Sequence, residues 1–216
     1  MFTGLVEACV PVRAWRPVGT GARLVLPAPE LAPGLPPWEP VLGESIAISG
    51  CCLTVIEIEP DGAVAFDLSK ETLDRTWFGS MDPERPVNLE RSVRLADRLG
   101  GHLVSGHVDG VGSVVGSEDT GDGGRLITFR VQAGFEPYLV QKGSVTIDGI
   151  SLTVVDPVAD RFGVAVIPET LERTSLGRAA VGQPVHLEAD QIGKWVERLL
   201  EARGSLGPVV GSPPQR

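Results

Sequence analysis

The chain has 216 residues, of which 42% are hydrophobic and 22% charged, a composition typical of water-soluble globular proteins that can bury a sizeable core. Its formal net charge of -9 disfavours nucleic acid and anionic membranes as partners, because both require a basic surface. No apolar run is long enough to span a bilayer, and we expect no N-terminal leader. Three cysteines, two of them adjacent, do not suit a disulfide framework, so we expect a reducing, cytoplasmic location.

An internal repeat runs through the chain, and its blocks keep their order. The matching pairs are MFTGLVE (1–7) with LVSGHVD (103–109), SIAISG (45–50) with SVTIDG (144–149), GCCLTV (50–55) with GISLTV (149–154), KETLDRT (70–76) with PETLERT (168–174), and PVNLE (86–90) with PVHLE (184–188). The offset within each pair stays between 98 and 102 residues. A period of this size indicates two copies of a small domain rather than a solenoid. We therefore predict homologous domains at residues 1–97 and 98–189.

Short alternating stretches indicate β-strands in both copies. Residues 45–48 alternate between apolar and small or polar side chains, and residues 64–68 read as a further strand. In the second copy, Asp148-Gly149 is a pair that tolerates positive φ in a tight hairpin turn. The 27 glycines and 18 prolines fall between such stretches, as in an all-β protein. Five or six short strands per copy are best closed into a small barrel, because closure removes exposed strand edges.

Three segments carry helical signals. Ser69 stands where an N-cap belongs, and Pro168 suits a first helical position, so we expect one short helix in each copy. Residues 190–203 are predicted to form a C-terminal α-helix that stops at Gly204. Residues 204–216, rich in Gly, Pro and Ser, are predicted to be a disordered tail. The helix has an apolar stripe that packs either on its own barrel or in a subunit interface: Ile192, Trp195, Val196, Leu199 and Leu200.

Motifs for metals and common cofactors are missing from the sequence. Adjacent Cys51 and Cys52 lack the spacing that lets two thiolates share one ion, and the three histidines have no accompanying carboxylate pattern. There is no phosphate loop and no dinucleotide fingerprint. Gly100-Gly101 is interpreted as a hinge between the copies. Small polar residues do recur in both copies, although each taken alone is also ordinary in a strand or a short helix.

Taken together, these blocks resemble the riboflavin synthase family, whose members contain two lumazine-binding repeats. The resemblance covers about residues 1–203 and rests on MFTG, GCCLTV, KETL, GGHLVSGHVDG, KGS followed by DGISLTV, and IPETLERT. It implies a transferase that moves a four-carbon unit between two molecules of 6,7-dimethyl-8-ribityllumazine. The products would be riboflavin and 5-amino-6-(ribitylamino)pyrimidinedione, in the riboflavin biosynthesis pathway. No metal and no organic cofactor would be needed.

The resemblance also implies a fold and an assembly. Each copy would be a six-stranded Greek-key β-barrel, and three chains would associate through the C-terminal helix as a homotrimer. A working site would lie between the first barrel of one subunit and the second barrel of its neighbour. Association with a lumazine synthase is a further possibility in the family. Two similar pockets would hold two identical reactants face to face, which lowers the entropic barrier to their reaction.

Ligand-contacting positions of the family carry over to both copies. In the first they fall on Gly4, Leu5, Val6, Cys52, Leu53, Thr54, Asp67, Leu68, Ser69, Lys70, Glu71 and Thr72. In the second they fall on Gly106, His107, Val108, Lys142, Ser151, Leu152, Thr153, Ile167, Pro168, Glu169, Thr170, Leu171 and Glu172. Ser45 and Asp190 are assigned as supporting residues near the ligand. Because each set falls within one copy, residues 1–97 alone are expected to fold and to bind one ligand.

Differences between the copies suggest where the chemistry occurs. Leu5 is replaced by His107 and Cys52 by Ser151, so similar pockets would offer different protonation chemistry. An imidazole titrates near neutral pH, so His107 is proposed for proton transfer, with a purely hydrogen-bonding contact as the alternative. Cys52 is either a nucleophile or a small residue that lines the pocket.

Two other functions are open at this stage. A non-catalytic lumazine or flavin carrier would be expected to degenerate in the second copy, whereas GHV, Lys142, SLT and IPETLE are intact here. A flavin-reductase-like barrel would need a nicotinamide site, for which no residues are found.

Overall fold

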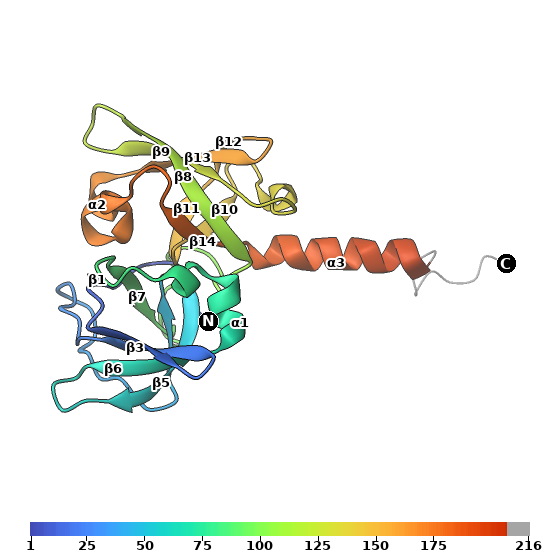
Figure 1. The fold of residues 1–216 in the computed structure, drawn as a ribbon. Helices are drawn as coiled ribbons and strands as arrows, with labels where there is room; N and C mark the ends of the chain where they lie inside the picture. The colour runs from blue at the N-terminus through green and yellow to red at the C-terminus, as the bar shows by residue number, and fades with distance from the viewer. Residues whose placement is uncertain (207–216) are drawn as a thin grey trace.

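Two β-barrels stand one above the other, and a long helix extends away from them (Figure 1). The structure is a computed structural model that describes residues 1–206, with side chains described up to residue 204. The predicted tail at 204–216 falls mostly outside the described residues. Among the described residues, no helix has the length and apolar character required to cross a membrane.

The first half of the chain forms one antiparallel sheet of seven strands. A short helix and a 3₁₀ turn (Trp77–Ser80) connect the last two strands and place Trp77 and Phe78 against the core. Ser69 caps the helix as predicted, because its side chain accepts a hydrogen bond from the Thr72 amide. The elements are β1 (Ala8–Val10), β2 (Ala14–Val18), β3 (Gly21–Leu26), β4 (Ser45–Ile48), β5 (Cys51–Ile58), β6 (Val64–Leu68), α1 (Lys70–Arg75) and β7 (Val87–Arg91).

The second half repeats this plan. Its short helix begins at Pro168, which is tolerated there because the first helical residue needs no amide hydrogen. Two 3₁₀ turns, Glu136–Tyr138 and Ser175–Arg178, lie in its connections. The other elements are β8 (Gly110–Asp119), β9 (Arg125–Arg130), β10 (Ser144–Ile147), β11 (Ile150–Thr153), β12 (Val155–Val158), β13 (Arg161–Val166), α2 (Pro168–Arg173) and β14 (Pro184–Ala189).

Both sheets have the same circular strand order, which confirms the duplicated β-barrel predicted from the sequence. The first sheet runs β1-β7-β4-β5-β6-β3-β2, and the second runs β11-β10-β14-β8-β9-β13-β12. In each sheet the two edge strands are consecutive along the chain, so they are two halves of one long strand around which the sheet curls. Joining these halves gives the expected six strands and one shared ring order in both copies.

A different strand of the repeat is divided in each copy, and this gives the count of seven: β1 and β2 correspond to the undivided β8, and β11 and β12 correspond to the undivided β5. In the first copy the gap between β1 and β2 contains Pro11, which has no amide hydrogen to donate to a neighbouring strand. In the second copy the gap is Val154, between β11 and β12. Asp156 follows with a φ of 45°, which bends the strand.

Each barrel has its own hydrophobic core. The first includes Leu24, Ile46 and Phe66, and the second includes Phe129, Ile147 and Phe162, all of them almost fully buried. A third, small cluster of Phe2, Ala47 and Val104 lies between the barrels. Because Phe2 and Val104 are equivalent neighbours in the repeat, this cluster marks the approximate two-fold axis that relates the copies.

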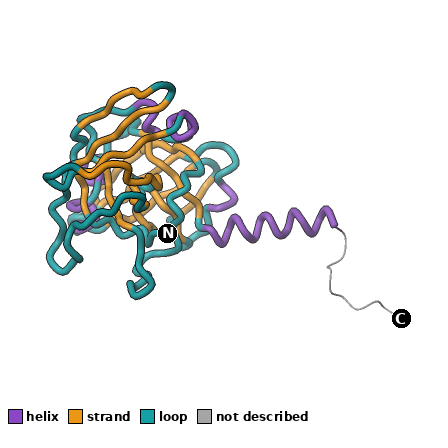
Figure 2. Tube along the Cα trace, turned by 90° about the horizontal axis from the view of Figure 1, so that it is seen from below, coloured by secondary structure: helices purple, strands orange, loops and turns teal. Residues whose placement is uncertain are grey.

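The C-terminal helix α3 (Gln191–Leu206) projects away from both barrels (Figures 1 and 2). Its apolar stripe is exposed, with Trp195 at 67% and Leu199 at 60% of their surface accessible. The alternative that the stripe packs on its own barrel is therefore wrong. The predicted stop at Gly204 is also wrong, because the helix continues to Leu206; a glycine in a helix costs only about 1 kcal/mol.

Candidate functional site

The loop that precedes each barrel crosses to the other barrel. The Cys52 amide donates to the Gly106 carbonyl at 2.7 Å, and the equivalent Ser151 amide donates to the Gly4 carbonyl at 2.8 Å. Val108 packs against the first core and Val6 against the second. Each predicted pocket therefore combines strand residues from one copy with a loop from the other.

This exchange corrects the grouping expected from the sequence. Residues Gly4, Leu5 and Val6 belong with Ser151 in the second pocket, whereas Gly106, His107 and Val108 belong with Cys52 in the first. The expectation that residues 1–97 contain a complete pocket is therefore wrong.

Glycine is required where the loops cross. Gly4 and Gly106 have φ values of 77° and 81°, a region that L side chains rarely adopt. A Cβ atom at Gly4 would lie 2.6 Å from the Cβ of Ser151, and one at Gly106 would lie 2.7 Å from the Cβ of Cys52. The G of GLV and GHV thus permits both the backbone turn and the close approach of the loop to the strand.

The residues predicted for the first pocket lie on β5, at the end of β6 and at the start of α1. Strand pairing places Ser45 on β4 directly opposite Thr54, next to Cys52, which is half-buried. Leu53 and Leu68 point into the core, whereas Asp67 is exposed and forms an ion pair with Arg23. On α1 the remaining predicted positions, Ser69, Lys70, Glu71 and Thr72, lie at the surface or are partly buried.

The second pocket repeats this arrangement. Ser151 and Leu152 are partly buried on β11 and Thr153 is exposed, while Ile167, Pro168 and Glu169 are exposed at the start of α2. Lys142 adopts a φ of 63°, at the position where the first copy has Gly43 with a φ of 84°. The remaining predicted members are the α2 residues Thr170, Leu171 and Glu172, together with Asp190, whose side chain accepts a hydrogen bond from the Ile192 amide at the start of α3.

The two loops place different side chains at equivalent points. Leu5 has 52% of its surface exposed, and His107 is likewise exposed. The amides of both residues donate to the hydroxyl of the residue two positions earlier, Thr3 or Ser105. The backbone therefore presents an apolar side chain at one predicted pocket and an imidazole at the other.

His102 is a functional candidate that the sequence analysis considered only as a metal ligand. It is 8% exposed, and its Nδ1 lies 2.7 Å from the Ser151 hydroxyl, while its Nε2 lies 3.1 Å from the Thr146 hydroxyl. Burial lowers the pKa of His102 and so favours the neutral ring. A neutral imidazole bonded to a hydroxyl can take up its proton, so the pair can act as an activated hydroxyl. In the sequence, the signal for this role was the first histidine of the GGHLVSGH motif.

Gly101 is also more than the hinge proposed from the sequence. A Cβ there would lie 2.1 Å from the Thr3 carbonyl oxygen and 2.8 Å from the Cβ of Ser151. The glycine thus allows the chain to pass between the first loop and the His102–Ser151 pair.

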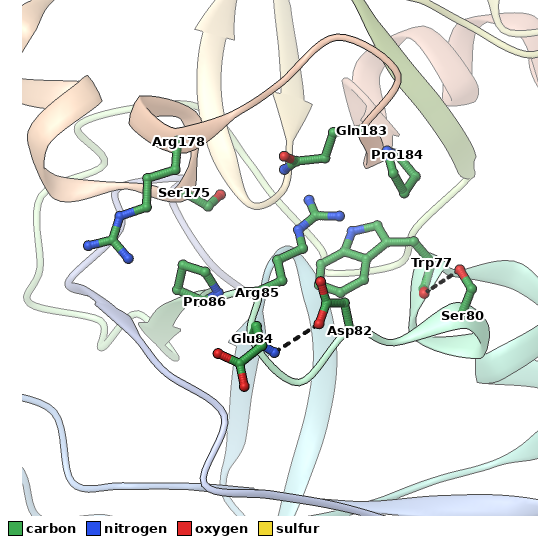
Figure 3. Close-up of a pocket in the computed structure, with 10 residues that line it drawn as sticks. All are labelled: Trp77, Ser80, Asp82, Glu84, Arg85, Pro86, Ser175, Arg178, Gln183 and Pro184. Carbon is green, nitrogen blue, oxygen red and sulfur yellow. Dashed lines mark hydrogen bonds between the residues drawn. The ribbon is translucent and has the colours of Figure 1, made fainter.

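Some of the predicted residues border open clefts on the single chain. One cleft of about 460 Å³ includes Leu5 beside Thr3 and Glu90, and another of about 410 Å³ includes Glu169 and Glu172. A third cleft of about 460 Å³ lies at the junction of the barrels and contains none of the predicted residues (Figure 3). There Arg85 lies over the Trp77 ring at 3.8 Å and pairs with buried Asp148 at 2.7 Å. This third cleft is bordered by a structural ion pair between the barrels.

The fold and the paired loop-and-strand contacts define a class of protein with two similar ligand-binding barrels in tandem. The comparisons specify this class further. A family model described as the lumazine binding domain matches residues 3–92 and 105–190. Riboflavin synthase of Mycobacterium tuberculosis is 42% identical over 94% of this chain and all of that protein, and riboflavin synthase of Actinobacillus pleuropneumoniae is 37% identical over 93% and 90%. The chain belongs to the riboflavin synthase family of lumazine-binding proteins.

Solved structures support the same fold. The crystal structure of LumP complexed with 6,7-dimethyl-8-(1'-D-ribityl) lumazine matches with a TM-score of 0.74 at 21% identity, over 88% of this chain and 99% of that chain. LumP complexed with riboflavin matches equally well. At this identity the likeness concerns the fold alone.

Proposed function

We propose that this chain is a riboflavin synthase that converts two molecules of 6,7-dimethyl-8-ribityllumazine into one riboflavin and one 5-amino-6-(ribitylamino)pyrimidinedione. A four-carbon unit leaves the donor lumazine and joins the acceptor, so two identical substrates give two different products. The observation that carries the proposal is that both loop-and-strand contacts, Gly106 with Cys52 and Gly4 with Ser151, are intact.

Two pockets of one shape but different chemistry suit this reaction. The donor must lose a proton from its 7-methyl group, and the acceptor must take a nucleophile at its ring. We assign proton transfer to His107 in the pocket of Cys52, with Cys52 as nucleophile or polar contact and Ser45 in support. In the other pocket, the Ser151 hydroxyl bonded to neutral His102 supplies an activated oxygen. The other predicted residues, including Lys142 and Asp190, bind or frame the substrates.

The assembly is part of the proposal. Through Leu5, Glu169 and Glu172 the second predicted pocket borders open clefts on one chain, and α3 exposes an apolar stripe. Both features favour a homotrimer in which neighbouring subunits complete each site. Association with a lumazine synthase, which would supply the substrate, would be detected by co-sedimentation. Three free cysteines agree with a cytoplasmic location.

Incubation of the purified protein with 6,7-dimethyl-8-ribityllumazine alone tests the proposed reaction. We expect two lumazines to disappear for each riboflavin formed, with the pyrimidinedione in equal amount to riboflavin and with no added cofactor. A lumazine that binds and is recovered unchanged would instead make the chain a carrier.

A further inference from the structure

Two buried glutamates hold the loops that cross between the barrels. Glu188 accepts hydrogen bonds from the Ser105 amide and hydroxyl, both at 2.7 Å, and from the Gly106 amide at 3.0 Å. Glu90 accepts the same three bonds from Thr3 and Gly4, at 2.6, 2.7 and 3.0 Å. These glutamates end the repeated PVNLE and PVHLE blocks, to which the sequence analysis assigned no role. Each fixes the backbone just before the residue presented to a pocket.

Among the described residues, only the second loop has additional contacts to the C-terminal helix. Gln191 on α3 donates from its Nε2 to the Ser105 hydroxyl at 2.9 Å. One turn further along, the Lys194 ammonium lies 2.5 Å from a carboxylate oxygen of Asp109. The segment with His107 at its centre is therefore bonded to α3 at both ends, at Ser105 and at Asp109.

In the part of the chain that the structure describes, the first loop makes no such contact with a helix. Glu7, the counterpart of Asp109, pairs with Arg91 at 2.8 Å on the strand that carries Glu90. The cation that pairs with the first loop is thus Arg91 on β7, whereas the cation that pairs with the second loop is Lys194 on α3. This asymmetry coincides with the difference between the exposed Leu5 and His107.

The His107 side chain depends on its backbone for position. Among the residues that the structure describes, the imidazole of His107 has no hydrogen-bond partner, whereas its amide donates to the Ser105 hydroxyl at 3.1 Å. That hydroxyl also bonds Glu188 and Gln191. Ser105 thus connects the strand, the helix and the backbone of His107, and a shift of α3 would move the loop.

We propose that Glu188, Gln191 and Lys194 are positioning residues for His107, and that α3 thereby sets the geometry of a catalytic loop in its own subunit. This role is separate from any contact that α3 makes with other subunits, and it rests on the proposed function for its catalytic part. A displacement of about 1 Å at a positioned catalytic group can lower the rate as much as about 100-fold.

The test uses the full-length double variant Gln191→Ala with Lys194→Met, in which methionine keeps the apolar stem and the helix propensity. Arg198→Ala is the matched control, because Arg198 contacts Glu201 on the same helix and neither end of the loop. We expect amide hydrogen exchange in residues 103–109 to become about 10-fold faster, since two tethers are lost. Turnover should fall about 10-fold with less than a threefold change in KM, whereas Arg198→Ala should match the parent in both respects.

The outcomes separate this inference from the proposed function. If the parent makes no riboflavin, the proposed function fails, while the exchange measurement still tests whether α3 holds the loop. Unchanged exchange in residues 103–109, or faster exchange with unchanged turnover, would overturn the inference. Sedimentation checks that the double variant keeps the assembly of the parent. If the double variant dissociates, exchange and turnover are measured instead on Gln191→Ala alone, which leaves the Lys194–Asp109 pair in place. The same two results would overturn the inference.

Discussion

Asn88 and His186 occupy equivalent positions in the two barrels and make equivalent hydrogen bonds across the interface between them. The Asn88 side chain donates to the Asp148 carbonyl at 2.8 Å and accepts from the Ser175 amide at 2.8 Å. The His186 ring donates from Nδ1 to the Ser49 carbonyl at 2.8 Å and accepts at Nε2 from the Trp77 amide at 3.0 Å. An amide in one copy thus does what an imidazole does in the other.

Replacing His186 by asparagine should therefore be tolerated far better than replacing it by alanine. His186→Ala leaves the Trp77 amide and the Ser49 carbonyl buried without partners, and we expect it to lower the free energy of unfolding by about 2 to 4 kcal/mol. His186→Asn should cost about 1 kcal/mol, since the amide can restore both bonds as Asn88 does. Urea unfolding measures both variants. Equal losses would show that ring stacking with Trp77, at 4.8 Å between centroids, matters more than the hydrogen bonds.

His186 should also make the protein less stable in acid. Burial lowers the pKa of His186 from 6.5 to about 3, and Arg85 adds to the effect, while the Ser49 carbonyl opposes it. The folded state thus binds fewer protons than the unfolded state between these values, so stability is complete above about pH 6.5 and is lost as the pH falls toward 3. Burial raises the pKa of Asp148, which makes the protein more stable as the pH falls. Asp148 is present in both the parent and His186→Asn, so a comparison of these two proteins isolates the effect of His186.

The comparison is between the parent and His186→Asn, by urea unfolding at a series of pH values from 7 to 4. The asparagine variant should lose less stability than the parent over that range. Parallel pH profiles for the two proteins would mean that other groups cause the acid sensitivity.

His107→Gln should reduce turnover without a comparable loss of substrate binding. Glutamine can keep a hydrogen bond but cannot exchange a proton, and removal of a general acid or base typically costs about 10²- to 10⁴-fold in rate. Steady-state kinetics and titration of lumazine fluorescence measure the two effects separately. Glu118→Gln is the control, because Glu118 is exposed on β8, the strand that follows the His107 loop. Weaker binding with normal turnover would reduce His107 to a contact residue.

The sequence predicted the architecture because repeated blocks at one offset require two similar barrels. It could not predict which barrel each N-terminal loop packs against, since Gly4 and Gly106 have equivalent surroundings whether or not they are exchanged. His102 was missed for a different reason. It lies one position before the matched block at residues 103–109, so the repeat gave no signal for its bond to Ser151. The extension of α3 beyond Gly204 depends on propensity terms of about 1 kcal/mol, below what a pattern can resolve.

Trp195→Asp combined with Leu199→Asp should dissociate the assembly. Both side chains are exposed on the single chain, at 67% and 60%, so the change should not disturb the barrels. Carboxylates buried without partners in an apolar interface would oppose association by several kcal/mol. Analytical ultracentrifugation should report the mass of one chain for the double variant. Arg198→Asp, off the apolar stripe on the same helix, should sediment like the parent. If the double variant kept the parent's mass, the stripe would not be the interface.

A fragment of residues 1–97 should form a dimer. Without the second half of the chain, the Cys52 amide has no Gly106 carbonyl to bind and the first core lacks Val108. The Gly4 loop of the fragment likewise has no Ser151 to pack against. Because Gly4 and Gly106 occupy equivalent positions, the Gly4 loop of a second fragment can replace the missing one, and the exchange is mutual. We expect sedimentation at twice the fragment mass, lumazine binding, and little riboflavin, since His107 is absent. The fragment 8–97, which lacks the exchanged loop, should not pair. A monomeric 1–97 fragment that binds lumazine as tightly as its parent would show that the crossed loop is dispensable for binding.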